Sequence, residues 1–117
     1  KEFIKMTGNL EKMRRVLRVL TQTNPDKLSE IEVENSLYEA KSKKPKKFLK
    51  VVTDKNLDLR AEIEKLVTAN IIRKIGNQHI YGEETIGENI TDTIIYFKNK
   101  KNSGAVNSIR AELKAIT

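Results

Sequence analysis

Residues 56–81, NLDLRAEIEKLVTANIIRKIGNQHIY, decide the fold, because a helical pattern passes there directly into a strand pattern. Apolar residues recur at helical spacing in the first half and predict a helix over about 58–67, with one face formed by Leu59, Ile63, Leu66 and Val67. The opposite face carries Arg60, Glu62, Glu64 and Lys65. Two β-prone runs follow, 71–75 and 79–81, and the residues between them, Gly76-Asn77-Gln78, favour a turn. We therefore expect a helix followed by a β-hairpin.

Two helices are predicted upstream of this stretch. The first covers about 10–22, where Asn9 is a suitable N-cap and the apolar stripe consists of Leu10, Met13, Val16, Leu17 and Leu20. Its polar face is strongly basic, with Lys12, Arg14, Arg15 and Arg18, and Pro25 ends it. The second helix begins at about 27–29 and ends near 42, with inward positions expected at Leu28, Ile31, Leu37 and Ala40.

A lysine cluster leads into a third, short helix. Pro45 is favourable at a helix start because its missing N–H has no intrahelical partner there, so we expect a helix over about 45–53. Only the turn 54–56 then separates it from the helix at 58. This spacing is typical of a helix-turn-helix.

The remainder of the chain is expected to be helical apart from its connections. Residues 82–87 are predicted to form an acidic loop, and a helix follows over about 90–99. A polar, glycine-containing break at 98–104 precedes a last helix over about 105–116. Its stripe, which suits packing on the core or on a partner helix, consists of Val106, Ile109, Leu113 and Ile116.

Composition excludes several kinds of site. The 117 residues fit one domain, include no cysteine, and include one histidine, so thiolate and multi-histidine metal sites are excluded within one chain. His79 is expected at the surface or at a strand edge rather than as a ligand or a catalyst. We therefore expect no enzymatic activity, no metal and no cofactor. The formal charge of +7 favours acidic partners such as nucleic acid, although lysine that simply solubilises the chain explains it equally well.

The run from Ile63-Glu64-Lys65-Leu66-Val67 through Ile71-Ile72-Arg73-Lys74 to His79-Ile80-Tyr81 resembles the end of winged helix-turn-helix domains. The resemblance implies a mainly α fold with a small β-hairpin. We expect a single domain over 1–117, with a winged-helix core at about 10–81 and a C-terminal helical extension at about 88–117. From 86 to 113 the chain is similar to small phage-encoded proteins.

Candidate nucleic-acid contacts fall in three places. The lysine loop lies near phosphates if the helix after it crosses the DNA backbone, and it contributes Lys43, Lys44, Lys46 and Lys47. The second helix of the pair and the turn before it contribute Lys55, Asn56, Arg60 and Lys65, although Glu62 and Glu64 repel phosphate there. The basic wing contributes Arg73, Lys74, Asn77 and Gln78.

These observations support two hypotheses. The first is a non-enzymatic module that binds duplex DNA, as a regulator or a replication or packaging accessory. The second is an interaction or structural module of a larger assembly, such as a phage virion, that docks on a protein partner or on another copy through its C-terminal helices. The sequence shows neither a long apolar run nor a signal peptide, so we expect a cytoplasmic or virion-associated protein without membrane contact.

Overall fold

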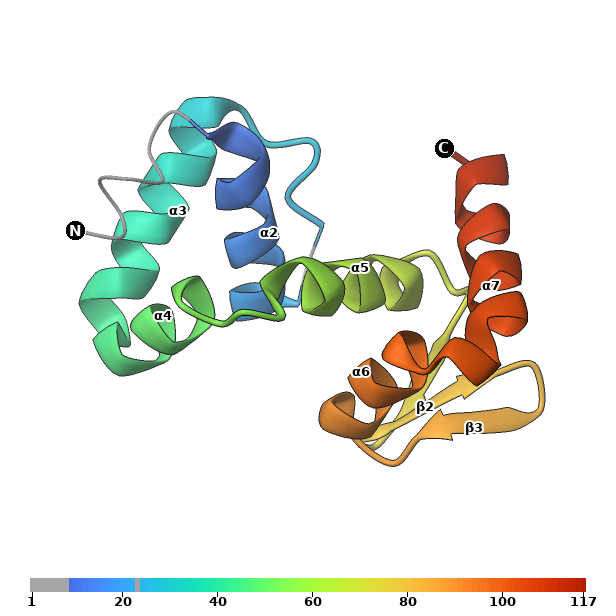
Figure 1. The fold of residues 1–117 in the computed structure, drawn as a ribbon. Coiled ribbons are helices and arrows are strands. Elements are labelled where there is room, and N and C mark those ends of the chain that lie inside the picture. The colour runs from blue at the N-terminus through green and yellow to red at the C-terminus, as the bar shows by residue number, and fades with distance from the viewer. Residues whose placement is uncertain (1–8, 23) are drawn as a thin grey trace. The chain divides into compact units, whose positions relative to one another are not determined.

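The computed structural model describes residues 9–22 and 24–117, and the chain is mainly helical with a small antiparallel sheet. It divides into two units, with the boundary between Glu64 and Lys65 (Figure 1). The first unit contains α2 (Leu10–Thr21), α3 (Glu30–Lys43), α4 (Pro45–Val52) and the beginning of α5 (Leu57–Thr68). The second contains the end of α5, β1 (Arg73–Ile75), β2 (Gln78–Tyr81), β3 (Glu84–Gly87), α6 (Ile90–Lys98), the 3-10 helix η1 (Lys100–Asn102) and α7 (Ser103–Ala115).

In the first unit α2, α3 and α4 pack against one another around a single apolar core. α2 and α3 are joined by the loop 22–29, and α4 follows α3 after one residue, Lys44. The buried core residues of this unit are Met13, Val16, Leu17, Val33, Leu37, Phe48, Val52 and Leu57. The helix over 10–22, the helix ending near 42 and the short helix from Pro45 are therefore confirmed.

Local signals set the helix ends. The side chain of Asn9 accepts a hydrogen bond from the backbone N–H of Lys12, which caps α2. Ser29 and Glu32 form a reciprocal capping box at the start of α3, with each side chain bound to the other's backbone N–H. Pro45 occupies the first turn of α4. The caps of α2 and α3 satisfy N–H groups that have no partner within the helix, and Pro45 has no N–H that needs one.

One inward position of α3 was predicted wrongly. Ile31 is 70% exposed, whereas Val33 and Leu37 are fully buried. Val33 and Leu37 are four residues apart and lie on one helix face, and Ile31 lies outside that face. Leu28 and Ala40 are partly buried against the core, as expected.

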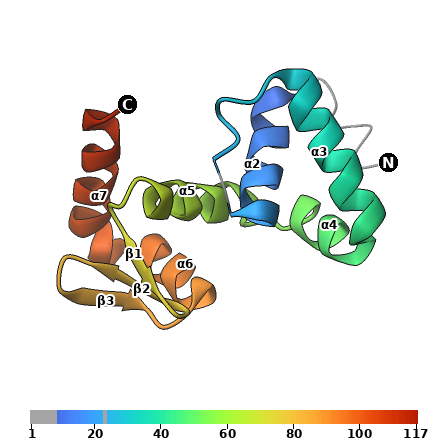
Figure 2. The same cartoon turned by 180° about the vertical axis from the view of Figure 1, so that it is seen from behind.

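The sheet of the second unit has three antiparallel strands in the order β1-β2-β3 (Figure 2). Gly76 and Gly82 begin the two tight connections, with φ of +61° and +63°. Glycine adopts these values without steric cost, and a type II′ hairpin turn requires them at its first central residue. The predicted hairpin is confirmed, with Gln78 in the second strand rather than in the turn.

The prediction of a loop over 82–87 was wrong, because residues 84–87 form β3. α6 packs against β2 and β3, and its buried side chains Ile94 and Phe97 join Ile72 and Ile86 in the core of this unit. α7 buries Val106 and Ile109, which are half of its predicted apolar stripe. Leu113 is half-buried and Ile116 is exposed.

Candidate nucleic-acid interface

The junction of α3 and α4 carries a group of exposed lysines. α4 buries Phe48 and Val52, one helical turn apart, packs Val51 partly against the core and exposes its other residues. The exposed cations around this junction form what we call the lysine surface: Lys43, Lys44, Lys46, Lys47 and Lys50. Four of these five lysines were predicted as contacts from the sequence. Lys50 was not, although its position four residues after Lys46 places it on the same helix face.

Two residues of the lysine surface, Lys46 and Lys47, are opposed by the dipole of α4. The N-terminal end of a helix carries partial positive charge, so carboxylates stabilise the first turn and cations destabilise it. Accordingly, the first turns of α2, α3, α5 and α6 each contain an acidic residue. The first turn of α4 contains none, and it holds Lys46 and Lys47 instead. The N-cap of α4, Lys44, makes no side-chain capping hydrogen bond.

Carboxylates neutralise little of this charge. Lys43 lies 3.6 Å from Glu39 across one turn of α3, and both side chains are about two-thirds exposed. Such a pair is largely screened by water and salt. Between residues 41 and 55 the chain holds seven lysines and a single carboxylate, Asp54.

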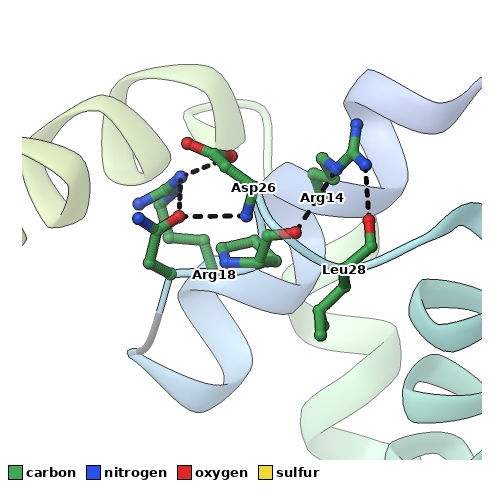
Figure 3. Close-up of polar contacts among 6 residues, drawn as sticks. Arg14, Arg18, Asp26 and Leu28 are labelled. Carbon is green, nitrogen blue, oxygen red and sulfur yellow. Dashed lines mark hydrogen bonds and ion pairs between the residues drawn. The ribbon is translucent and has the colours of Figure 1, made fainter. Parts of the chain in front are cut away.

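The arginines of the first unit, in contrast, bind other parts of the protein. Arg14 donates hydrogen bonds to the backbone carbonyls of Leu28, at 2.7 Å, and Pro25, at 3.4 Å (Figure 3). Arg18 lies one turn further along α2 and is only 4% exposed, and its guanidinium lies 2.8 Å from a carboxylate oxygen of Asp26. The two guanidinium groups therefore hold the loop between α2 and α3.

Arg18 was predicted on the solvent-exposed basic face of this helix, and that prediction was wrong. Its burial follows from the loop, whose Asn24 and Asp26 side chains both contact the guanidinium. Arg15 pairs instead with Glu11 and Asp58 through longer contacts of 3.4 and 3.6 Å. The basic face of α2 is consequently occupied by internal contacts at all three arginines.

Three of the four predicted contacts in and before α5 are less exposed than the lysine surface. Arg60 was expected to be exposed, but it is half-buried, and its Nε lies 2.6 Å from Oδ2 of Asp54. Asp54 also accepts a hydrogen bond from the backbone N–H of Asn56, so it organises the turn between α4 and α5. Asn56 and Lys65 are half-buried, and Lys55 is exposed. Of the four predicted residues, Lys55 is thus the most accessible to a ligand.

The predicted wing residues lie together on the hairpin β1–β2 of the second unit. Arg73 donates a hydrogen bond of 2.9 Å to the carbonyl of Gly82, and the amide of Gln78 donates one of 2.7 Å to Glu88. Lys74 and Asn77 are exposed. The hairpin therefore offers Lys74 and Asn77 to a ligand. Arg73 and Gln78 instead bind the connections that follow β2 and β3.

His79 was predicted at the surface or at a strand edge, which was wrong, because it is 1% exposed and lies on β2, the middle strand of the sheet. Its Nδ1 lies 2.8 Å from Oγ1 of Thr93 on α6, a residue far along the chain that local sequence patterns did not connect with it. Burial lowers the pKa of His79 below its usual 6.5, and the ammonium group of Lys74 lowers it further. His79 is therefore neutral at pH 7.

A second polar contact joins β2 to α7. The hydroxyl of Tyr81 donates a hydrogen bond to the carboxylate of Glu112, and this bond raises the pKa of Tyr81 above 10. The tyrosine therefore remains protonated at neutral pH.

Comparisons with protein families, curated proteins and solved structures gave no match to this chain. Within residues 9–22 and 24–117, no three His, Cys, Asp or Glu side chains are grouped so that they could hold a metal ion. In the same ranges no helix has the length and apolar character needed to cross a membrane.

Proposed function

We propose that this chain is a non-enzymatic module that binds duplex DNA through the phosphates, with the lysine surface as its principal contact. The observation that carries the proposal is the accumulation of exposed lysines at the α3–α4 junction, two of which, Lys46 and Lys47, lie in the first turn of α4, where their charge is unfavourable. A bound phosphate would relieve that repulsion and release counterions from the DNA.

The residue types favour binding without recognition of particular bases. Arginine and asparagine read base edges through paired hydrogen bonds, whereas lysine acts on phosphate as a point charge. The arginines of the first unit are engaged inside the protein, and lysines are what it offers to a ligand. We therefore expect similar affinity for duplexes of different sequence.

A winged helix-turn-helix arrangement remains our proposal for how duplex DNA is held. In it α4 and α5 form the helix pair and the hairpin β1–β2 is the wing. The short turn between α4 and α5, and the position of the hairpin four residues after α5, support the assignment. Lys74 and Asn77 would be the wing contacts, and both are exposed.

Salt dependence tests the proposal quantitatively. If all five residues of the lysine surface neutralise phosphates, the logarithm of affinity falls with the logarithm of salt at a slope of about −4.5, so binding weakens about 500-fold between roughly 50 and 200 mM salt. The triple variant Lys46→Gln, Lys47→Gln, Lys50→Gln retains two contacts, and the same change of salt should weaken its binding only about 10-fold. Fluorescence anisotropy with a labelled duplex measures both values.

A matched variant controls for net charge. Lys100→Gln, Lys101→Gln and Lys114→Gln remove three exposed lysines from the second unit, and we expect the wild-type salt slope to persist. Equal slopes for the two triple variants would reject the lysine surface as the binding site. Absent binding by the wild-type protein at low salt would reject the function itself.

A further inference from the structure

The buried contact between His79 and Thr93 links the sheet to α6. Both side chains are at most 1% exposed, and His79 Nδ1 lies 2.8 Å from Thr93 Oγ1. The same hydroxyl donates to the backbone carbonyl of Asn89 at 2.9 Å. Because a hydroxyl carries one hydrogen, it accepts from histidine while it donates to Asn89. This assigns the proton of the neutral imidazole to Nδ1 and leaves Nε2 without one.

Nε2 of His79 has no hydrogen-bond partner among the residues that the structure describes, although it is buried. A bare ring nitrogen tolerates this environment better than a charged N–H group does, since a buried cation without an acceptor is costly. Protonation would place such a group at Nε2. The closed packing of this unit is therefore suited to the neutral ring alone.

The packing around Thr93 leaves little room for an adjustment. A Cβ atom on Gly87 of β3 would lie 2.1 Å from Oγ1 of Thr93 and 2.6 Å from its backbone nitrogen. α6 therefore rests directly on β3 at the position where Gly87 pairs with His79 in the strand register. A charged imidazole could gain a hydrogen-bond partner for Nε2 only if the elements around it moved apart.

The charged groups near His79 do not favour its cation. Lys74 is its partner across β1 and β2. The nearest carboxylates along the neighbouring elements are Glu88, which follows β3 and accepts from Gln78, and Asp92, which precedes Thr93 on α6. Both are exposed. The lysine thus opposes protonation, and neither carboxylate is bonded to the ring.

We propose that His79 is an acid-sensitive latch, whose protonation releases α6 from the β-sheet of the second unit. In the open form the imidazole contacts water. Well above pH 6.5 the ring is neutral in both forms, and the closed form keeps its full stability.

The direction of the pH effect follows from proton linkage. The pKa of His79 is lowered in the closed form and has its ordinary value of about 6.5 in the open form. As the pH falls through 6.5, the open form therefore binds more protons than the closed form, by up to one per molecule. The ratio of open to closed molecules then rises toward tenfold per pH unit, until the pH reaches the pKa of the closed form.

Hydrogen exchange of the full-length protein, followed by NMR, tests the latch. Protection factors, corrected for the intrinsic pH dependence of exchange, should fall by up to about fivefold between pH 6.5 and 5.5 for amides of β2 and α6. Amides of α2 and α3 provide the internal control and should keep their protection. Because the chain has a single histidine, its imidazole signal can be followed in the same samples.

Two results would overturn the latch. One is an imidazole that titrates near pH 6.5 while the protection of β2 and α6 stays constant. The other is a parallel loss of protection in both units, which would indicate general acid unfolding. A His79→Phe variant adds a second check, since it should abolish the pH dependence of protection in α6. If this variant does not fold, the wild-type measurement decides alone.

Discussion

The ion pair between Arg18 and Asp26 supports a quantitative prediction for the variant Asp26→Ala. The Arg18 side chain is 5% exposed and would lose its only carboxylate partner among the described contacts, which lies at 2.8 Å. Loss of one partner of a fully buried pair costs about 3–5 kcal/mol. Asp26 is 44% exposed and Asn24 still accepts from the guanidinium, so we expect a smaller loss, about 2 kcal/mol in the free energy of unfolding.

The matched control is Glu39→Ala, which breaks an ion pair between exposed side chains on α3. Its cost should stay below about 0.5 kcal/mol. Urea titration followed through NMR signals of α2 and α3 reports on the first unit separately. If Asp26→Ala and Glu39→Ala destabilise these helices equally, the guanidinium is not held as the structure implies.

A third variant, Arg18→Met, separates two contributions to the free energy of unfolding: the stabilisation by the ion pair itself, and the penalty for leaving a buried charge without a partner. It removes the cation and leaves an apolar side chain in a buried position. Replacement of a buried charge by an apolar residue is often mild, whereas an unpaired charge is not. Arg18→Met should therefore cost less than Asp26→Ala. If Arg18→Met costs more than Asp26→Ala, the bonds from the Arg18 guanidinium to the loop between α2 and α3 stabilise the protein by more than the burial of an unpaired charge destabilises it.

Two further pairs of variants test the packing, with stability measured by thermal unfolding. Gly87→Ala should lower the free energy of unfolding by about 3 kcal/mol, because the added Cβ would meet the backbone of Thr93 at 2.6 Å. The matched variant Gly104→Ala in α7 adds a Cβ that meets nothing within 4 Å, and it should raise the free energy of unfolding by about 0.5 kcal/mol. A neutral Gly87→Ala would contradict the close contact of α6 with β3. Leu37→Ala should cost about 3 kcal/mol and Ile31→Ala less than about 0.5, since only Leu37 is buried. Equal losses would show that the inward face of α3 is assigned wrongly.

The helices could be predicted from the sequence because their boundaries depend on neighbouring residues. Asn9, the Ser29-Glu32 pair and Pro45 act within one turn of the helix that they start. Such signals are visible without knowledge of the rest of the fold. The missed strand β3 is different, because it contains a single buried apolar side chain, Ile86. The available clue was Gly82, which follows a strand and precedes a polar residue as Gly76 does.

The errors at polar residues have a common cause in contacts distant along the chain. Arg18 is buried because Asp26 returns from the following loop, and His79 is buried because Thr93 on α6 covers it. The helical and strand spacing of apolar residues does not reveal that Asp26 contacts Arg18 or that Thr93 contacts His79. In the candidate interface, the exposed positions of the lysines could be inferred from Phe48 and Val52. That the arginines bind carbonyl and carboxylate groups of the protein itself could not be inferred in this way.

The positions of the lysines bear on whether their charge serves the proposed binding of phosphate or only keeps the chain in solution. Solubility requires charge on the surface but no particular position for it. Lys41 and Lys43, in the last turn of α3, complement the dipole of that helix, so stability alone explains them. Lys46 and Lys47 lie in the first turn of α4, where a carboxylate would be the stabilising choice. The proposed binding of phosphate would account for two lysines at positions that stability opposes, and under that proposal α4 contributes the larger share of the contact.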